Sequence, residues 1–257
     1  MFRRELTLFF IAMGFFTRIP MPAWVTVDSD NLNRANRYFG LVGILVGGLS
    51  AAVYALAVNW LPASVAIIFA MITSAIVTGG FHEDGLADTA DGFGGGWTVA
   101  DKLLIMKDSR LGSYGALALV FILLLKWQIL TEVAVIDTNM VSVILIVGHC
   151  LSRVFAASFI FTEQYVSDSD TSKSKPLAQN QSVNELVISL GTALIILLLL
   201  SLSQALILIG SLLLLRWGLV VAFRRQIGGY TGDTLGAGQQ ISEMLCYLII
   251  LILVSSL

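Results

Sequence analysis

Seven long apolar segments follow one another along the 257-residue chain and constrain its fold more than any other feature. A helix of about 17–25 residues crosses the hydrocarbon core of a bilayer, and spanning segments must satisfy their own backbone hydrogen bonds there. The segments lie at about residues 38–60, 64–81, 113–130, 141–161, 184–202, 204–223 and 241–257. We therefore expect an all-α, polytopic membrane bundle of about seven transmembrane helices that forms a single domain, residues 1–257.

Composition supports this class, and the N-terminus adds a shorter element. Charged residues make up only 12% of the chain, whereas a soluble domain has about 25%. An apolar run from Leu6 to Phe16 is closed by Arg18 and Pro20. No small-residue cleavage site follows, as a signal peptide would require. We expect a retained interfacial or half-inserted helix here and not an eighth span.

Basic residues lie on one side of the predicted bundle. Twelve of the 15 lysines and arginines precede the first apolar segment or fall in the connections after the second, fourth and sixth segments. The positive-inside rule places these parts of the multi-pass chain in the cytoplasm and the C-terminus outside. Transporters commonly carry ionisable residues near the membrane midplane in repeated halves, and we see no internal repeat. An enzyme with its active site on the cytoplasmic side fits this pattern better.

The segment 79–96 reads GGFHEDGLADTADGFGGG and carries four carboxylates within nine positions, Glu83, Asp84, Asp88 and Asp91. In a helix, the three aspartates stand at i, i+4 and i+7 and share one face. Their repulsion favours a bound cation, and a divalent hard metal takes carboxylate oxygens while leaving positions for phosphate or water. We expect the three aspartates to be metal ligands, with Glu83 as a further candidate. The alternative is a solvated helix end whose acids complement the helix dipole.

Two further polar clusters lie on the same predicted side. The first, KDSRLGSYG at 107–115, offers Lys107 and Arg110 to a phosphate, with Asp108 between them. Basic residues beside a span can instead anchor it to anionic lipid headgroups. The second cluster, GGYTGDTLGAGQQ at 228–240, is rich in glycine and is interpreted as a loop folded closely around a ligand.

Three ionisable residues and one loop complete the candidates. His82 could ligate a metal or donate to a phosphate, although a lone histidine is about as often structural. Arg153 lies within a predicted span, where burial in lipid is costly, so it should face the interior and meet anionic substrate or an aspartate. His149 is expected to pack or to form an interhelical hydrogen bond. The polar loop 162–183 is expected to act as a lid over substrate.

Four motifs, FFTRIPMP, HEDGLADTADGFGGG, MKDSRLGSYG and GGYTGDTLGAGQQISE, resemble in this order those of the cobalamin synthase family, the adenosylcobinamide-GDP ribazoletransferases. The resemblance covers the whole chain and implies a magnesium-dependent enzyme of the inner membrane. Such an enzyme joins adenosylcobinamide-GDP to α-ribazole or its 5′-phosphate, releases GMP, and forms adenosylcobalamin or its 5′-phosphate. This reaction belongs to the last stage of vitamin B12 assembly.

The resemblance and the polar clusters together suggest a displacement at phosphorus. Mg²⁺ would be held by the aspartates of the acidic motif, and cationic side chains would bind phosphate oxygens. Asp84 or Asp233 would accept the proton of the attacking ribose hydroxyl. The expected catalytic residues are Asp84, Asp88, Asp91 and Asp233, and the expected metal ligands are Asp84, Asp88, Asp91 and Glu83. The expected substrate-binding residues are His82, Lys107, Asp108, Arg110, Arg153 and Tyr230.

Two other functions are considered. The CDP-alcohol phosphotransferases of phospholipid synthesis also use helical aspartates at a membrane surface, but their DGxxAR pattern is absent. After Asp84-Gly85 this chain continues Leu86-Ala87-Asp88, and the arginine is missing. A transporter or channel is the third possibility. The expected partners are two small-molecule substrates and the lipid bilayer, with no nucleic acid, and a homo-oligomer is left open.

Overall fold

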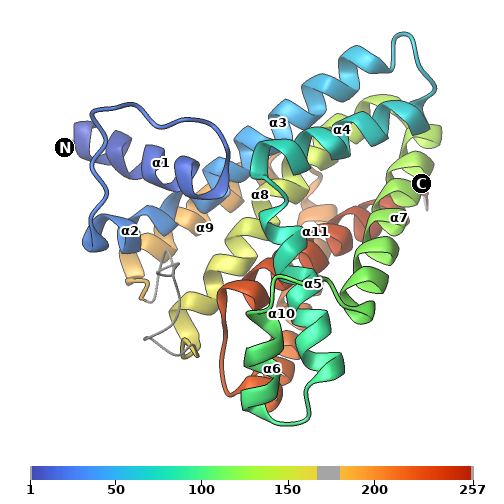
Figure 1. Cartoon of the computed structure of the whole chain (residues 1–257). Helices are drawn as coiled ribbons and strands as arrows, with labels where there is room; N and C mark the ends of the chain where they lie inside the picture. Colours follow the sequence, from blue (N-terminus) through green and yellow to red (C-terminus); the bar gives the residue numbers. More distant parts are fainter. Residues whose placement is uncertain (1, 167–179, 256–257) are drawn as a thin grey trace.

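The computed structural model describes residues 2–166 and 180–255, and in these ranges the chain is helical (Figure 1). The one β-bridge in this part, between Tyr165 and Tyr230, lies outside any strand. The predicted all-α fold is therefore confirmed. In chain order the helices are α1 (Phe2–Phe16), α2 (Ser29–Ala35), the 3₁₀ helix η1 (Asn36–Tyr38), α3 (Phe39–Ala57), α4 (Ala63–Thr78), α5 (Phe81–Gly95), α6 (Val99–Met106), α7 (Ser113–Ile136), α8 (Thr138–Thr162), α9 (Val183–Leu197), α10 (Leu202–Ile227) and α11 (Gly232–Ser255).

Five helical segments of the described chain are long and apolar enough to cross a membrane. They are Asp30–Ala57, which ends in α3, together with α7, α8, α10 and α11. The chain is thus a multi-pass membrane protein, as its hydropathy predicts. The other two of the seven expected segments form shorter helices, α4 with 16 residues and α9 with 15.

A sharp bend shortens α4 and begins the acidic motif. Gly79 and Gly80 adopt left-handed backbone conformations with φ of 70° and 69°, which side-chain-bearing residues rarely adopt. The axis turns by 87° between α4 and α5 at this point. The segment expected to continue to residue 81 therefore stops at Thr78, and α5 leaves in a new direction toward α6 (Figure 1).

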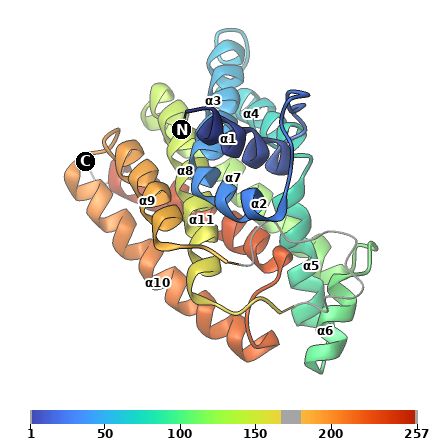
Figure 2. The ribbon, with the colours of Figure 1, turned by 90° about the vertical axis from the view of Figure 1, so that its left-hand side faces the viewer.

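Helix α8 forms the centre of the bundle, and α10 lies at its outside (Figure 2). Within the most apolar window of each helix, 83% of α8 is buried inside the protein but only 17% of α10. Glycines let α3 approach α8 closely: a Cβ on Gly43 would lie 2.2 Å from the His149 carbonyl oxygen, and one on Gly47 2.8 Å from the Ile146 Cα. Small residues commonly permit such contacts in membrane bundles, where the hydrophobic effect cannot drive helix association.

The N-terminal helix α1 packs one face against the protein and is not among the candidate spans. Its buried residues include Leu8, Ile11 and Phe16. Arg37 joins α1 to α9 because its guanidinium bonds Glu5 at 3.0 Å and also pairs with Glu185. These contacts hold the start of α1 against η1 and α9.

Candidate active site

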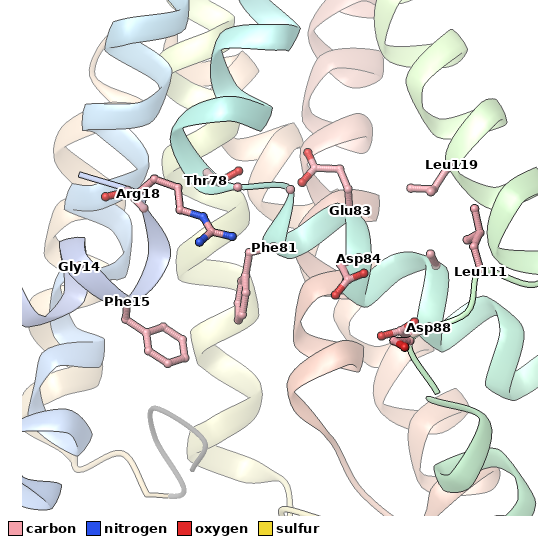
Figure 3. A pocket seen from close by; sticks show the side chains of 15 residues that line it. Gly14, Phe15, Arg18, Thr78, Phe81, Glu83, Asp84, Asp88, Leu111 and Leu119 are labelled. Carbon is pink, nitrogen blue, oxygen red and sulfur yellow. The ribbon is translucent and has the colours of Figure 1, made fainter. Parts of the chain in front are cut away.

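A pocket of about 680 Å³ opens where the end of α1, the α4–α5 bend, α5 and the start of α7 meet (Figure 3). This volume lies within the usual range for small-molecule sites. The lining residues are Gly14, Phe15, Thr17, Arg18, Thr78, Gly79, Gly80, Phe81, Glu83, Asp84, Ala87, Asp88, Ser109, Leu111 and Leu119. The first two motifs thus meet Ser109 and Leu111 of the third motif, MKDSRLGSYG, in one cavity.

Three acidic residues of α5 form one wall of the pocket. Asp84 and Asp88 are one helical turn apart and lie on the same side of the cavity, as the i, i+4 spacing predicts (Figure 3). Burial and the negative charges of Asp233, Asp84 and Asp91 raise the pKa of Asp88 to about 7. Burial is the larger cause of this shift, and repulsion among the neighbouring carboxylates adds to it.

Asp233 reaches this wall from α11 because two glycines allow a close helix crossing. A Cβ on Gly85 would lie 2.9 Å from the Asp233 carbonyl oxygen and 3.1 Å from the Gly236 Cα. Figure 1 shows α11 beside α5 at this crossing. The backbone contact thus places Asp233 next to the acidic motif, although Asp233 itself does not line the pocket.

The third cluster is not the ligand-binding loop that we expected. Helix α11 begins at Gly232, so most of the glycine-rich segment is helical. Thr231 and Thr234 begin the helix by exchanging backbone-to-side-chain hydrogen bonds of 2.8 and 3.2 Å. The expectation was wrong because Gly232, Gly236 and Gly238 are helical and Gly236 packs against Gly85 of α5, while Gly228 ends α10. Tyr230 is fully buried against Tyr165 and is not part of the pocket lining.

Asp91 lies beyond the pocket and holds the start of α7. Its carboxylate accepts hydrogen bonds from the backbone N–H of Gly112 at 2.7 Å and of Gly115 at 2.9 Å. A Cβ at either glycine would lie less than 2.5 Å from an Asp91 oxygen, at 2.3 and 2.4 Å. Both carboxylate oxygens of this expected metal ligand are therefore engaged by orphan donors of a helix N-terminus.

The three cations expected to bind phosphate are not among the residues that line the pocket. Arg110 is 88% exposed at its side chain and pairs with Asp108, its Nε donating to both carboxylate oxygens at 3.0 Å. Lys107 ends α6. Arg153 is buried in α8, where its Nη1 donates to the His149 carbonyl oxygen at 3.0 Å.

Arg18 is the basic residue of the pocket, and sequence reasoning did not select it as a site residue. It lies in the turn after α1, across the cavity from Asp84 and Asp88 (Figure 3). Among the lining residues it is the only lysine or arginine. The available signal was the motif FFTRIPMP, which we used only for the family resemblance.

His82 points away from the acidic wall. It is buried, its ring stacks on Phe16 with centroids 5.7 Å apart, and it is not a lining residue. Burial lowers the pKa of His82 well below its usual value, so the ring is neutral. These contacts favour the structural role that we had weighed for it.

A buried polar network inside the bundle connects α7, α8 and α11 to Glu83. Lys126 of α7 donates to Gln240 and Glu243 of α11 at 2.7 Å each. His149 Nδ1 lies 3.0 Å from Glu243, which confirms the expected interhelical contact. Gln240 then donates to Glu83 at 3.1 Å, so the network ends at the pocket wall. Of this network, Glu83, His149 and Arg153, which bonds to His149, were selected from the sequence, whereas Lys126, Gln240 and Glu243 were not.

The carboxylates do not form a closed metal cage. In the described residues, no group of three or more His, Cys, Asp or Glu side chains converges tightly enough to hold a metal ion by itself. The wall formed by Asp84 and Asp88 is instead open toward the cavity (Figure 3). An open wall of this kind leaves space for oxygens that a substrate supplies.

Comparisons with known proteins identify the family. The family model for cobalamin-5-phosphate synthase matches residues 8–251. The chain is 69% identical to an adenosylcobinamide-GDP ribazoletransferase of Shewanella halifaxensis over 98% of both chains. It is 61% identical to the protein of the same name from Shewanella oneidensis over 97% of this chain and 95% of the relative. No solved structure matches the chain. This protein therefore belongs to the cobalamin-5-phosphate synthase family.

Proposed function

We propose that this chain is an adenosylcobinamide-GDP ribazoletransferase. It transfers the cobinamide phosphate of adenosylcobinamide-GDP to α-ribazole or α-ribazole 5′-phosphate and releases GMP. The observation that carries this proposal is the pocket in which Asp84 and Asp88 face Arg18. A wall of acids opposite a guanidinium suits a phosphoryl-transfer site, and the names of the end-to-end relatives support this reaction.

Mg²⁺ is the cofactor that fits the acidic wall. The carboxylates of Asp84 and Asp88 accept no hydrogen bond from any described residue, and their neighbours are acidic. Protein-bound Mg²⁺ commonly uses one or two carboxylates and completes its shell with waters and substrate phosphates. Asp84 and Asp88 would hold the ion, with Glu83 beside them. The bound ion would neutralise charge on phosphate oxygens during transfer.

A carboxylate near the wall receives the proton of the acceptor. The acceptor hydroxyl oxygen forms a bond to the cobinamide phosphorus, while the bond from that phosphorus to the GMP oxygen breaks. The hydroxyl proton passes to Asp233, because Asp84, the other candidate, would hold the ion. Asp233 lies beside α5, where its negative charge acts on Asp88, and it is not among the proposed ion ligands.

The bacterial inner membrane is the proposed location, with the pocket on the cytoplasmic side. Support comes from the basic residues, most of which share the side of the chain where the α4–α5 bend and the start of α7 lie. The long apolar helices would hold the pocket at this membrane surface. We place both substrates in the cytoplasm for the same reason.

Nucleotide release by the purified protein tests the function. The protein, in lipid nanodiscs, is given adenosylcobinamide-GDP with α-ribazole or its phosphate, or a CDP-linked donor with a lipid alcohol, with Mg²⁺ or with EDTA. We expect GMP from the first donor, no CMP from the second, and loss of GMP release in EDTA that added Mg²⁺ restores. CMP release would support a phospholipid-type phosphotransferase instead. Solute flux in sealed vesicles without nucleotide release would support a transporter.

A further inference from the structure

We propose that Arg18 binds the diphosphate of the nucleotide-linked donor and orients it against the acidic wall. This inference rests on the proposed function, because it names a donor-binding residue of the same site. Arg18 lies across the pocket from Asp84 and Asp88, so an anion bound between them would contact both sides (Figure 3). A guanidinium can bind two phosphate oxygens at once through its fork of donors.

The lack of a charged partner for Arg18 among the described residues supports a role in ligand binding. Three carboxylates line the same pocket, yet Arg18 forms no ion pair or side-chain hydrogen bond with any residue that the structure describes. By contrast, Arg37 and Arg224 each pair with a glutamate. Arg18 is exposed at the pocket, so a ligand can reach its guanidinium. The donors of Arg18 are therefore available to a ligand.

The backbone around Arg18 is fixed relative to the acids. The Arg18 N–H donates to the Val77 carbonyl oxygen at 2.7 Å, which joins the turn after α1 to the end of α4. The Thr17 hydroxyl donates to the Met13 carbonyl oxygen at 2.7 Å and accepts from the Ile19 N–H at 3.2 Å. Arg18 is thereby held at the bend from which α5 leaves with Asp84 and Asp88.

Gly79 shapes the space that the guanidinium occupies. A Cβ on Gly79 would lie 2.3 Å from Arg18 Nε, whereas a Cβ on Gly80 would meet nothing within 4 Å. Both glycines have nearly the same positive φ, so alanine at either position strains the backbone similarly. Only alanine at Gly79 would also displace Arg18, which makes the two glycines a matched pair.

Steady-state kinetics test the role of Arg18. In nanodiscs, Arg18→Ala should lower kcat/KM for adenosylcobinamide-GDP by about 10- to 100-fold, as expected for a lost charge-assisted phosphate contact. The loss should lie mainly in the donor KM, with the α-ribazole KM near the wild-type value. Arg18→Lys should recover part of the loss. The matched control Arg225→Ala removes an exposed cation outside the pocket and should behave as wild type.

The glycine pair provides an independent check. Gly79→Ala should lower the donor kcat/KM more than Gly80→Ala does in the wild-type background. In the Arg18→Ala background, the two glycine variants should have equal effects, because there is no longer a guanidinium to displace. An equal loss from Gly79→Ala in both backgrounds would overturn the positioning of Arg18 by Gly79.

Two further outcomes separate the possible failures. If the wild type releases GMP and Arg18→Ala has the same donor kinetics as Arg225→Ala, the role of Arg18 is overturned but the proposed function is not. A wild-type protein that releases no GMP would overturn the proposed function itself. Nanodiscs with and without anionic lipid distinguish a donor phosphate from a lipid headgroup. An Arg18→Ala defect that disappears without anionic lipid would assign Arg18 to the headgroup and refute the proposal.

Discussion

Asp91 and Asp84 carry the same side chain on one face of α5, yet their replacement should have different effects. Asp91 accepts two backbone hydrogen bonds from the start of α7, from Gly112 and Gly115. Asp84 lines the pocket and accepts none from the described residues. Asp91→Ala should therefore reduce stability, whereas Asp84→Ala should reduce turnover and leave stability nearly unchanged.

The size of the Asp91 effect follows from the two donors. The bond to Gly115 is buried, and an orphaned buried N–H costs about 1–3 kcal/mol. The bond to Gly112 is part-buried at the first turn, where loss of a helix cap costs about 1 kcal/mol. Asp91→Ala should thus lower the free energy of unfolding by about 2–4 kcal/mol. For a chain of this size the melting temperature should fall by about 5–15 °C.

Thermal unfolding in detergent, followed by circular dichroism, measures this effect, with Asp84→Ala as the matched control. Below the melting temperature of Asp91→Ala, GMP release should require about the same Mg²⁺ concentration as in the wild type. Asp91→Asn should be intermediate in stability, because its amide keeps one acceptor oxygen. If Asp91→Ala melted at the wild-type temperature and needed more Mg²⁺ for GMP release, the helix-capping role would be refuted and Asp91 would be a metal ligand.

Two other predictions concern packing behind the pocket. Gly85→Ala should lower kcat by up to about 100-fold, because its Cβ would push against the backbone of Asp233 and shift that carboxylate. The control is Gly95→Ala on the same helix, where a Cβ meets only Ile105 at 3.5 Å. Its kinetics should stay near those of the wild type. Lys126→Met should destabilise the protein by about 3–5 kcal/mol, because Glu243 is left buried without its cation. Chemical unfolding checks the second prediction, and an unchanged unfolding midpoint would show that Glu243 is satisfied without Lys126.

Much of the candidate site could be predicted from local spacing. Asp84 and Asp88 face the same cavity because residues four apart share a helix face in any α-helix. Asp91 follows the same rule, but its carboxylate bonds to the start of α7, because α7 begins against that end of α5. Helical periodicity predicts which side chains share a face, but it does not predict what covers each part of that face.

The positions of the basic side chains were even harder to predict from local sequence. Lys107 and Arg110 lie close to the acidic motif in the sequence, yet neither lines the pocket. Arg18 is distant in the sequence, but the turn after α1 bonds to the end of α4 and brings it across from the acids. Similarly, the segment 228–240 resembles a loop in composition, and only the structure shows that most of it is helical and that Gly236 packs against α5.

The amino-acid sequence was sufficient to predict a multi-pass helical membrane protein, because hydrophobic length and helical periodicity are local properties of a segment. It also determined that α5 presents a pair of aspartates on one face. The tertiary structure decided the bend at Gly79 and Gly80, the capping role of Asp91 and the position of Arg18. These features depend on contacts between helices that are far apart in the chain, and such contacts form only when the whole bundle packs.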